Sequence, residues 1–186
     1  MATRARVGVF GIGLAAYWPQ FEGLKGRIEA HLRHVEAQVG QWAEVVSGGL
    51  VDSAGMGAAV GDRFARQDLD LLVCYAGTYA TSTQVLPVVQ RAGVPVLLLN
   101  LQPVAALDYA TADTATWLEN CGVCPVPELA GVFLRSAIRF EVIAGVLHDD
   151  PAAWDQVAAW CRAAGVARTV RRSRFGMLGH TCPGMI

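Results

Sequence analysis

The sequence has few charged residues and no long uninterrupted apolar run. Only 17% of its 186 residues are Asp, Glu, Lys or Arg, and the formal net charge is −1, so it lacks the basic surplus typical of nucleic-acid binding. No stretch of about 18 consecutive apolar residues occurs, which argues against a membrane span. A signal-peptide pattern is also missing from the amino terminus. We expect a cytoplasmic protein with neither nucleic-acid nor membrane partners, and a short basic run, 168–174, that is a solvated connector.

The cysteines give little support to a disulfide framework. There are five of them, an odd number without a secretion signal, which favours reduced thiols. Cys121 and Cys124 have the C-x-x-C spacing of redox and zinc sites, but no second Cys or His pair follows at finger spacing. The motif also comes late in the chain and leads into Pro125, whereas a thioredoxin-like motif follows the first strand and opens a helix. We expect small buried thiols, with redox or metal binding as the alternative.

Apolar runs alternate with amphipathic segments along the chain, which predicts an α/β fold. Strands are expected at 7–12, 43–47, 69–75, 94–100 and 140–146, and helices at 21–39, 58–65, 82–92, 114–120, 127–136 and from 151. Gly48 and Gly49 are interpreted as a link after the second strand. Asp150 is the expected cap of the last helix, with Pro151 as its first residue. The strands are apolar enough for a parallel sheet buried on both faces, a flavodoxin-like or Rossmann-like three-layer sandwich.

A short sequence pattern occurs twice in the chain and suggests a second domain. Arg6 to Ile12 reads RVGVFGI, and residues 174–180 read RFGMLGH, with Arg and two glycines in the same places. The first copy opens a domain, so we expect the second, as a buried strand at 175–179, to open another. The predicted organisation is an N-terminal α/β domain at 1–172 and the start of a second domain at 173–186, with the rest absent from this chain.

In an open parallel sheet, ligands bind beyond the carboxyl ends of the strands. The loop after the first strand matches G-x-G-x-x-A at 11–16, the dinucleotide fingerprint. However, Tyr17, Trp18 and Pro19 separate the glycines from the expected helix, in which Pro19 would be the first residue. The second strand also ends in Ser47, Gly48 and Gly49 where an acidic residue would hold a ribose. A nucleotide or flavin site is the least favoured reading.

The two other loops carry hydroxyls, amides and one aromatic ring. Their side chains belong to Thr78, Tyr79, Thr81, Ser82, Asn100 and Gln102. Such groups offer hydrogen bonds and a flat apolar face to a neutral polyhydroxylated ligand. The alternative is local: Ser82 would cap a helix, while Asn100 and Gln102 would satisfy loop backbone. The residues alone do not separate these two interpretations.

Five segments resemble the N-terminal domain of the L-arabinose isomerase and L-fucose isomerase group. They are GIGLAAYWPQFEGL, CYAGTYATSTQVLPV, LLNLQP, PELAGVFLRS and RFGMLGHTCPGM. The resemblance implies that this chain is the first domain of a longer sugar isomerase, inactive by itself. The full-length protein would interconvert an aldose and a ketose through an enediol, with a divalent metal, usually Mn²⁺, that stabilises the enediolate.

The resemblance also implies a homo-oligomer, a trimer or hexamer, in which this domain covers the neighbour's active site. The substrate-binding residues would be Tyr17, Trp18, Thr78, Tyr79 and Gln102. Glu128 would orient them or pair across the subunit interface, although a carboxylate in the first turn of a helix has a local explanation as well.

No catalytic residue and no metal triad are expected within this chain. His31 and His34 are interpreted as lying on a solvated helix face, His148 with its neighbouring aspartates as part of a helix cap, and His180 as part of the domain junction. The main alternative to the isomerase reading is a stand-alone flavodoxin-like module that binds a sugar or another small molecule without catalysis.

Overall fold

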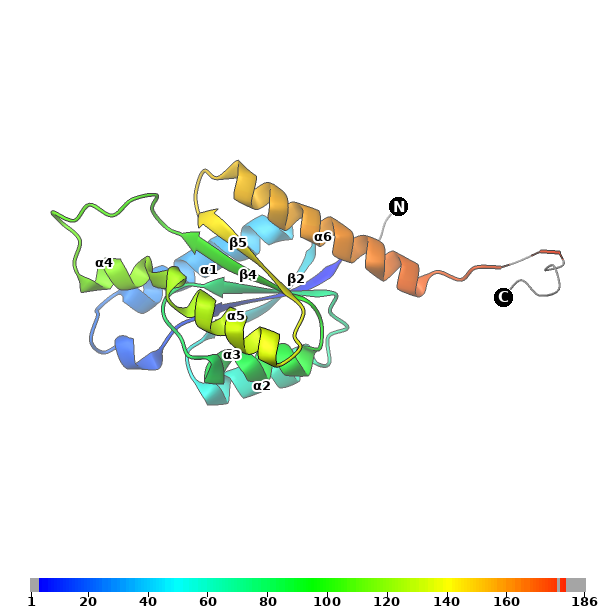
Figure 1. Cartoon of the computed structure of the whole chain (residues 1–186), viewed down its shortest axis with the longest axis horizontal. Coiled ribbons are helices and arrows are strands. Elements are labelled where there is room, and N and C mark those ends of the chain that lie inside the picture. Colours follow the sequence, from blue (N-terminus) through cyan, green and yellow to red (C-terminus); the bar gives the residue numbers. More distant parts are fainter. Residues whose placement is uncertain (1–3, 177, 180–186) are drawn as a thin grey trace.

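Five parallel strands form one sheet in the order β2-β1-β3-β4-β5 (Figure 1). The computed structural model describes residues 4–176, 178 and 179. The strands are β1 Arg6–Ile12, β2 Glu44–Val51, β3 Leu71–Ala76, β4 Val96–Gln102 and β5 Phe140–Val146. This is the strand order of flavodoxin-like sheets, in which the order reverses between β1 and β3. The predicted α/β three-layer sandwich is confirmed.

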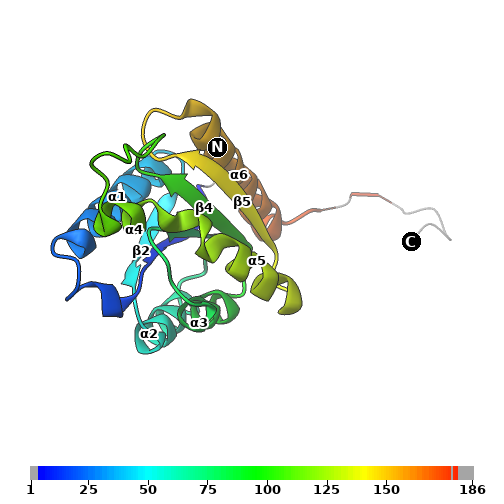
Figure 2. The same ribbon diagram turned by 60° about the vertical axis from the view of Figure 1, so that its left-hand side comes forward.

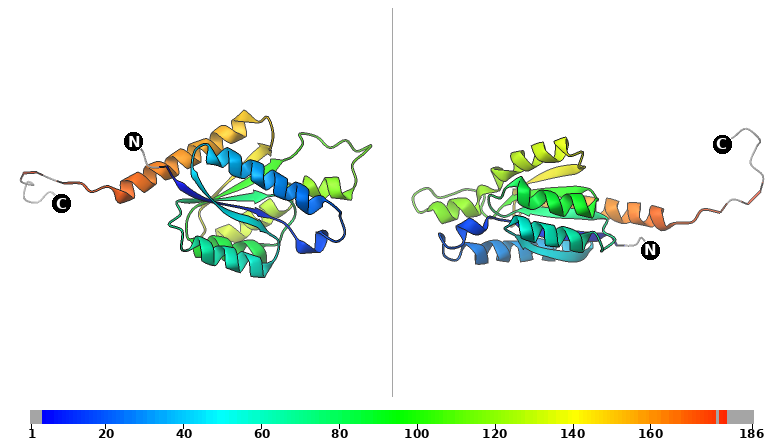
Figure 3. Two further views of the ribbon diagram at one scale, coloured as in Figure 1. Left: turned by 180° about the vertical axis from the view of Figure 1, so that it is seen from behind. Right: turned by 90° about the horizontal axis from the view of Figure 1, so that it is seen from below.

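Helices cover both faces of the sheet (Figures 2 and 3). The elements are α1 Leu24–Gly40 and α6 Pro151–Arg172 on one face, and α2 Ala54–Phe64, α3 Ser82–Ala92 and α5 Pro125–Arg135 on the other. Three short elements lie near the carboxyl ends of the strands: η1 Ala15–Tyr17, α4 Thr114–Glu119 and η2 Cys121–Val123. Side chains along a strand alternate between the two faces of the sheet, which gives two hydrophobic cores. Val7 and Val9 of β1 pack toward α1, while Phe10 and Ile12 pack toward α2 and α3.

The glycines predicted to form a link lie inside β2 instead. Val9 of β1 pairs with Ser47, and Phe10 pairs with Gly49, so Gly48 is an extra residue in the strand. A Cβ on Gly48 would come within 2.7 Å of the Phe10 Cβ and 3.1 Å of the Val9 carbonyl oxygen, and Gly49 has a φ of 73°. The correction has a simple cause: the bulge needs glycine, and glycine in a sequence also indicates a turn.

The start of α6 agrees with the sequence. Pro151 is its first residue, and the Asp150 carboxylate accepts hydrogen bonds from the Ala153 amide at 3.1 Å and the Val146 amide at 3.0 Å. These bonds satisfy a free helix amide and join the helix start to the end of β5. They also explain why the pKa of Asp150 lies below its ordinary value of 3.8.

The basic run at the end of α6 is part of the fold rather than a solvated connector. The Arg168 guanidinium, with a side chain only 7% exposed, donates to Asp70 at 3.0 Å and to Asp68 at 3.0 Å. Arg171 contacts Asp70 as well, and Arg172 contacts Asp68 at 2.8 Å. The prediction failed because the carboxylates that pair with this run are about a hundred positions earlier in the chain.

The segment after α6 projects away from the sheet (Figure 1). Its described residues, 173–176, 178 and 179, form no strand, and the side chains of Phe175 and Leu178 are exposed. The predicted buried strand at 175–179 is therefore not formed by them. Residues 177 and 180–186, including His180 and Cys182, lie outside the described residues. The second domain stays a prediction.

Candidate functional site

Loops from different strands meet at the carboxyl edge of the sheet. Tyr17 ends the short helix after β1, and Tyr79 lies in the loop after β3. Burial raises the pKa of Tyr17 above its ordinary value of 10.0. Electrostatic repulsion from the nearby Cys121, Tyr79 and Cys124 side chains raises it further. Tyr17, Tyr79 and the C-x-x-C segment are therefore neighbours in space, although about a hundred positions separate Tyr17 from Cys124 in the sequence. They lie at the reversal point between β1 and β3, where flavodoxin-like folds bind ligands.

Glu128 fixes the loop that carries Tyr79. It lies in the first turn of α5, where its Oε1 accepts a hydrogen bond from the Ser82 amide at 3.0 Å and its Oε2 faces the Tyr79 hydroxyl at 3.4 Å. The negative charge of Glu128, followed by burial, raises the pKa of Tyr79 above 10.0. Of the two roles left open for Glu128, the orienting contact is present within this chain. Tyr79 is half-buried rather than fully presented outward.

Trp18 forms a hydrogen bond that connects two loops of the fold. Its indole N–H donates to the Asp52 carboxylate at 2.8 Å, which ties the loop after β1 to the end of β2. A Cβ on Gly13 would lie 2.8 Å from the Trp18 ring, so the ring packs directly on the glycine at the start of this loop. The role of Trp18 in a sugar pocket stays a prediction. The bond to Asp52 could not be read from local spacing.

Thr78 and Gln102 both lie at the carboxyl edge of the sheet, and their role as substrate-binding residues stays a prediction. Thr78 is fully buried, so its hydroxyl is enclosed rather than displayed. Gln102 is the last residue of β4, where its carbonyl accepts from the Leu147 amide at 2.7 Å. Its side chain is half-buried. The arrangement therefore brings together Tyr17, Tyr79 and Glu128 out of the predicted site residues.

The predicted helix cap at Ser82 is off by one residue. Thr81 is the residue before α3, and its amide donates to the Gln84 side chain at 2.9 Å. The same buried Gln84 donates to the carbonyls of Asp52 at 2.5 Å and Gly13 at 3.2 Å. The T-x-x-Q spacing of a capping box was available in the sequence. Its link to the loop after β1 was not.

Three buried side-chain oxygens come from β3, the loop after it and β4. Within residues 4–176, 178 and 179, three buried side-chain oxygens have no hydrogen-bond partner: Tyr75 Oη, Thr78 Oγ1 and Asn100 Oδ1. A Cβ on Gly122 would be 2.8 Å from both Asn100 Oδ1 and the Ala76 carbonyl oxygen. The η2 turn therefore sits directly on the ends of β3 and β4. Buried polar groups normally find a partner, so these three oxygens are exceptions among the described residues.

The loop after β1 does not have the geometry of a dinucleotide site. The first long helix, α1, begins only at Leu24, after Gly23 with a φ of 74°. Pro19 lies in a turn before it rather than at its first position, which corrects the expected helix start. The α1 amides thus begin eleven positions after Gly13, and a pyrophosphate at the glycines would not face them.

The histidines are less solvated than predicted. His31 Nε2 lies 2.7 Å from Glu119 of α4, and its side chain is 15% exposed. The His34 and His148 rings are 4.6 Å apart, and burial, followed by the charge of His148, lowers the pKa of His34. The expectation failed because α4 and the loop before α6 cover this face of α1. No group of three or more potential metal ligands occurs among the described residues.

Solved structures include chains similar to this one. No protein-family model and no curated protein match the chain. The inhibitor-bound form of an aryl esterase from M. smegmatis is similar, with 13% identity, a TM-score of 0.45, and coverage of 89% of this chain and 99% of that one. The resemblance to the L-arabinose and L-fucose isomerase group stays a prediction.

One expectation is corrected by this match. The sequence predicted a sugar isomerase for the full-length protein, whereas the similar solved structure is an esterase, a hydrolase. The prediction of isomerase activity is therefore wrong on this finding and is not taken further. At 13% identity the esterase's own activity is not transferred to this chain either. The predicted Mn²⁺ and the trimer or hexamer stay predictions. In the part of the chain that the structure covers, no helix has both the length and the apolar character to cross a membrane.

Proposed function

We propose that the carboxyl edge of the sheet binds a small, neutral, polyhydroxylated molecule of the sugar or polyol class, without a catalytic step. The observation that carries the proposal is the convergence of Tyr17, Tyr79 and Glu128 from three separate elements at the reversal point of the sheet. This is the non-catalytic alternative left open by the sequence. The cytoplasmic location belongs to the same proposal.

The chemistry of these side chains suits such a ligand. A phenol ring offers an apolar face to the C–H groups of a sugar, and its hydroxyl both donates and accepts hydrogen bonds. The Glu128 carboxylate has acceptor capacity beyond its bonds to the Ser82 amide and the Tyr79 hydroxyl, and can accept from a ligand hydroxyl. Small-molecule sites usually combine a few fixed polar groups with apolar and aromatic side chains.

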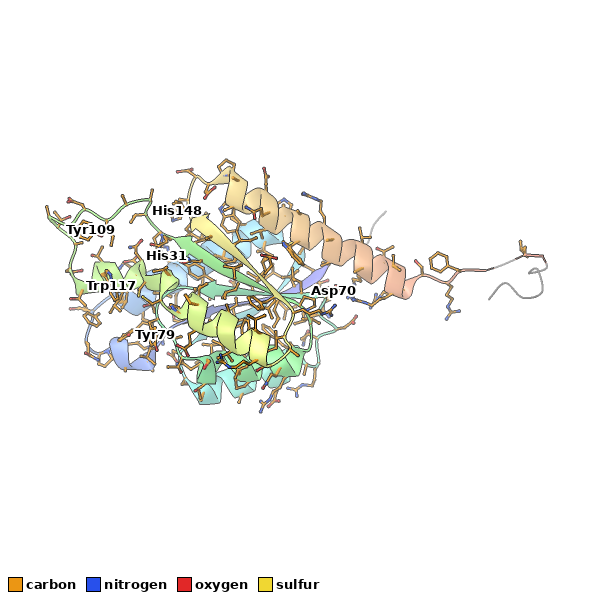
Figure 4. All side chains as sticks on the ribbon, in the orientation of Figure 1. His31, Asp70, Tyr79, Tyr109, Trp117 and His148 are labelled. Carbon is orange, nitrogen blue, oxygen red and sulfur yellow. The ribbon has the colours of Figure 1, made fainter. Side chains whose placement is uncertain are left out.

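Binding should be tested by calorimetry on the isolated chain with a panel of pentoses, 6-deoxyhexoses and polyols. Tyr79→Ala and Glu128→Gln should each raise the Kd of a binding sugar by about tenfold or more, equivalent to ~1.4 kcal/mol. The matched control is Tyr109→Ala, because Tyr109 is 87% exposed in the loop after β4 and lies away from Tyr79 (Figure 4). This control should leave the Kd unchanged.

Two results would overturn the proposal. One is the absence of any sugar or polyol binding at millimolar concentration by a chain that circular dichroism shows to be folded. The other is a Kd that changes in Tyr109→Ala as much as in Tyr79→Ala, because binding would then lie elsewhere on the molecule.

A further inference from the structure

The C-x-x-C segment does open a helix, contrary to the expectation from the sequence. Cys121 begins η2, and Cys124 directly precedes Pro125, the first residue of α5. The Cys124 amide donates to the Cys121 carbonyl at 3.0 Å, which closes a tight turn between them. In a 3₁₀ turn the side chains at i and i+3 eclipse. The two thiols therefore extend from the same side of the turn, as an intramolecular disulfide requires.

The two thiols differ in exposure. Cys121 is 2% exposed, whereas Cys124 is exposed to solvent. Burial, together with a hydrogen bond to the Cys124 thiol, raises the pKa of Cys121 to about 12. An accessible thiol in contact with a buried one is the arrangement of an attacking and a resolving cysteine. Cys124 also directly precedes Pro125, the first residue of α5.

The other described cysteines provide an internal contrast. Cys74 lies in β3 and Cys161 in α6, and both are buried in the cores on opposite faces of the sheet. The pKa of Cys161 is raised to about 11 by burial. Neither thiol is accessible to a reagent without opening the fold, so their reactivity serves as a baseline for Cys124.

We propose that Cys121 and Cys124 form a reversible dithiol–disulfide pair that exchanges with low-molecular-weight disulfides of the glutathione class. The Cys124 thiol gives its proton to solvent, and its thiolate attacks one sulfur of the small disulfide. That S–S bond breaks, and the leaving thiolate takes up a proton. The product is a mixed disulfide on Cys124 and one free small thiol.

The second step closes the pair. The Cys121 thiol loses its proton, and its sulfur attacks Cys124, which breaks the mixed disulfide and releases the second small thiol after protonation. Overall the protein loses two electrons and two thiol protons, and the small disulfide gains them. Formation of the mixed disulfide removes the Cys124 thiol that helps to raise the pKa of Cys121.

The exchange would alter the surroundings of Tyr17 and Tyr79 at the carboxyl edge of the sheet. Tyr17 has both cysteines among its neighbours, and Tyr79 has Cys124 among its own. The proposal does not rest on sugar binding at that edge. It depends only on the turn geometry and on the unequal exposure of the two thiols.

The test is peptide mapping of the full chain after incubation with oxidised glutathione. Free thiols are then blocked with iodoacetamide under denaturing conditions, and the protein is digested with trypsin. Cys121 and Cys124 share the tryptic peptide 92–135, which contains no other cysteine, so an internal disulfide shows as unalkylated and two hydrogens lighter. We expect that form, and we expect dithiothreitol to reverse it. Cys74 and Cys161 should be alkylated throughout.

Variants separate the two roles. Cys121→Ser should stop the reaction at a glutathione mixed disulfide on Cys124, whereas Cys124→Ser should leave Cys121 unmodified. Cys161→Ser is the control and should oxidise as the unaltered chain does. In the folded chain, Cys124 should react at least about tenfold faster than Cys161. Recovery of both cysteines as alkylated after oxidation would overturn the proposal, and so would a disulfide that joins Cys124 to Cys182 or to another chain.

Discussion

The guanidinium of Arg168 donates to the carboxylate of Asp70, which lies 98 positions earlier in the chain and is completely buried. Asp70 also accepts a hydrogen bond from the Arg6 amide at 2.8 Å and pairs with Arg171. The two residues connect the last turns of α6 to the amino ends of β1 and β3. A buried carboxylate depends on such partners, because its transfer from water is costly without them.

Arg168→Ala should lower the free energy of unfolding by about 1–3 kcal/mol, because it leaves Asp70 with fewer charged partners. The loss is smaller than for a fully isolated pair, since Arg171 and the Arg6 amide remain. The control is Arg162→Ala at an exposed position of the same helix, which should change stability by less than about 0.5 kcal/mol. Urea unfolding would measure both. Equal effects of the two substitutions would show that Asp70 does not need Arg168.

Stability should fall as the pH is lowered through the histidine range. The pKa of His34 in the folded chain is below its ordinary value of 6.5, so the unfolded chain takes up this proton first. The stabilisation is complete above pH 6.5 and is lost as the pH falls toward the folded pKa. His34→Gln should flatten the decrease in Tm between pH 7 and pH 5, as measured by circular dichroism. An unchanged slope in this variant would assign the decrease to other groups.

Two glycines of α2 should respond in opposite ways to alanine. A Cβ on Gly57 would come within 2.1 Å of the Gln84 carbonyl oxygen, whereas a Cβ on Gly55 would meet nothing within 4 Å. We expect Gly57→Ala to destabilise the chain by about 2–3 kcal/mol, because α2 and α3 must move apart. Gly55→Ala should be neutral or stabilise by up to about 1 kcal/mol. Denaturant unfolding of both variants compares close packing with helix propensity. Similar losses in the two would contradict the predicted approach of α2 to α3.

Removing the Glu128 charge should be visible in the titration of Tyr79. The pKa of Tyr79 is raised first by Glu128, so Glu128→Gln should bring it down toward 10.0. The ultraviolet absorbance of phenolate against pH measures this change. Glu141→Gln, at an exposed position of β5, is the control and should leave the curve unchanged. An identical curve for Glu128→Gln would mean that the two side chains do not interact in solution.

Local sequence signals were sufficient for most of the fold. The bounds of α3 and β5 agree with the prediction, although the cap of α3 is Thr81 rather than Ser82, and a clear apolar run marks the strand. Asp150 and Pro151 likewise specify the start of α6 without help from the rest of the chain. Such signals depend on neighbouring residues, which is why they could be read correctly.

Contacts between distant residues could not be predicted in this way. Trp18 bonds to Asp52, His31 to Glu119 and Arg168 to Asp70, across 34, 88 and 98 positions. None of these contacts was predicted, because each partner comes from a distant element. The candidate site is of the same kind. Its residues were proposed singly, and the Tyr79–Glu128 contact was left as one of two possibilities until the fold brought the loop after β3 beside α5.

The position of α6 limits where the chain can go next. Strand-to-strand crossovers in parallel sheets are almost always right-handed. Here the crossovers through α2, α3 and α5 run toward β5, and the crossover through α1 runs toward β2 from the opposite face. Since α6 shares the face of α1, a right-handed return from it would lead back to β4, whose both sides are already paired. A right-handed crossover through α6 therefore runs away from the free side of β5, toward the β2 side of the sheet.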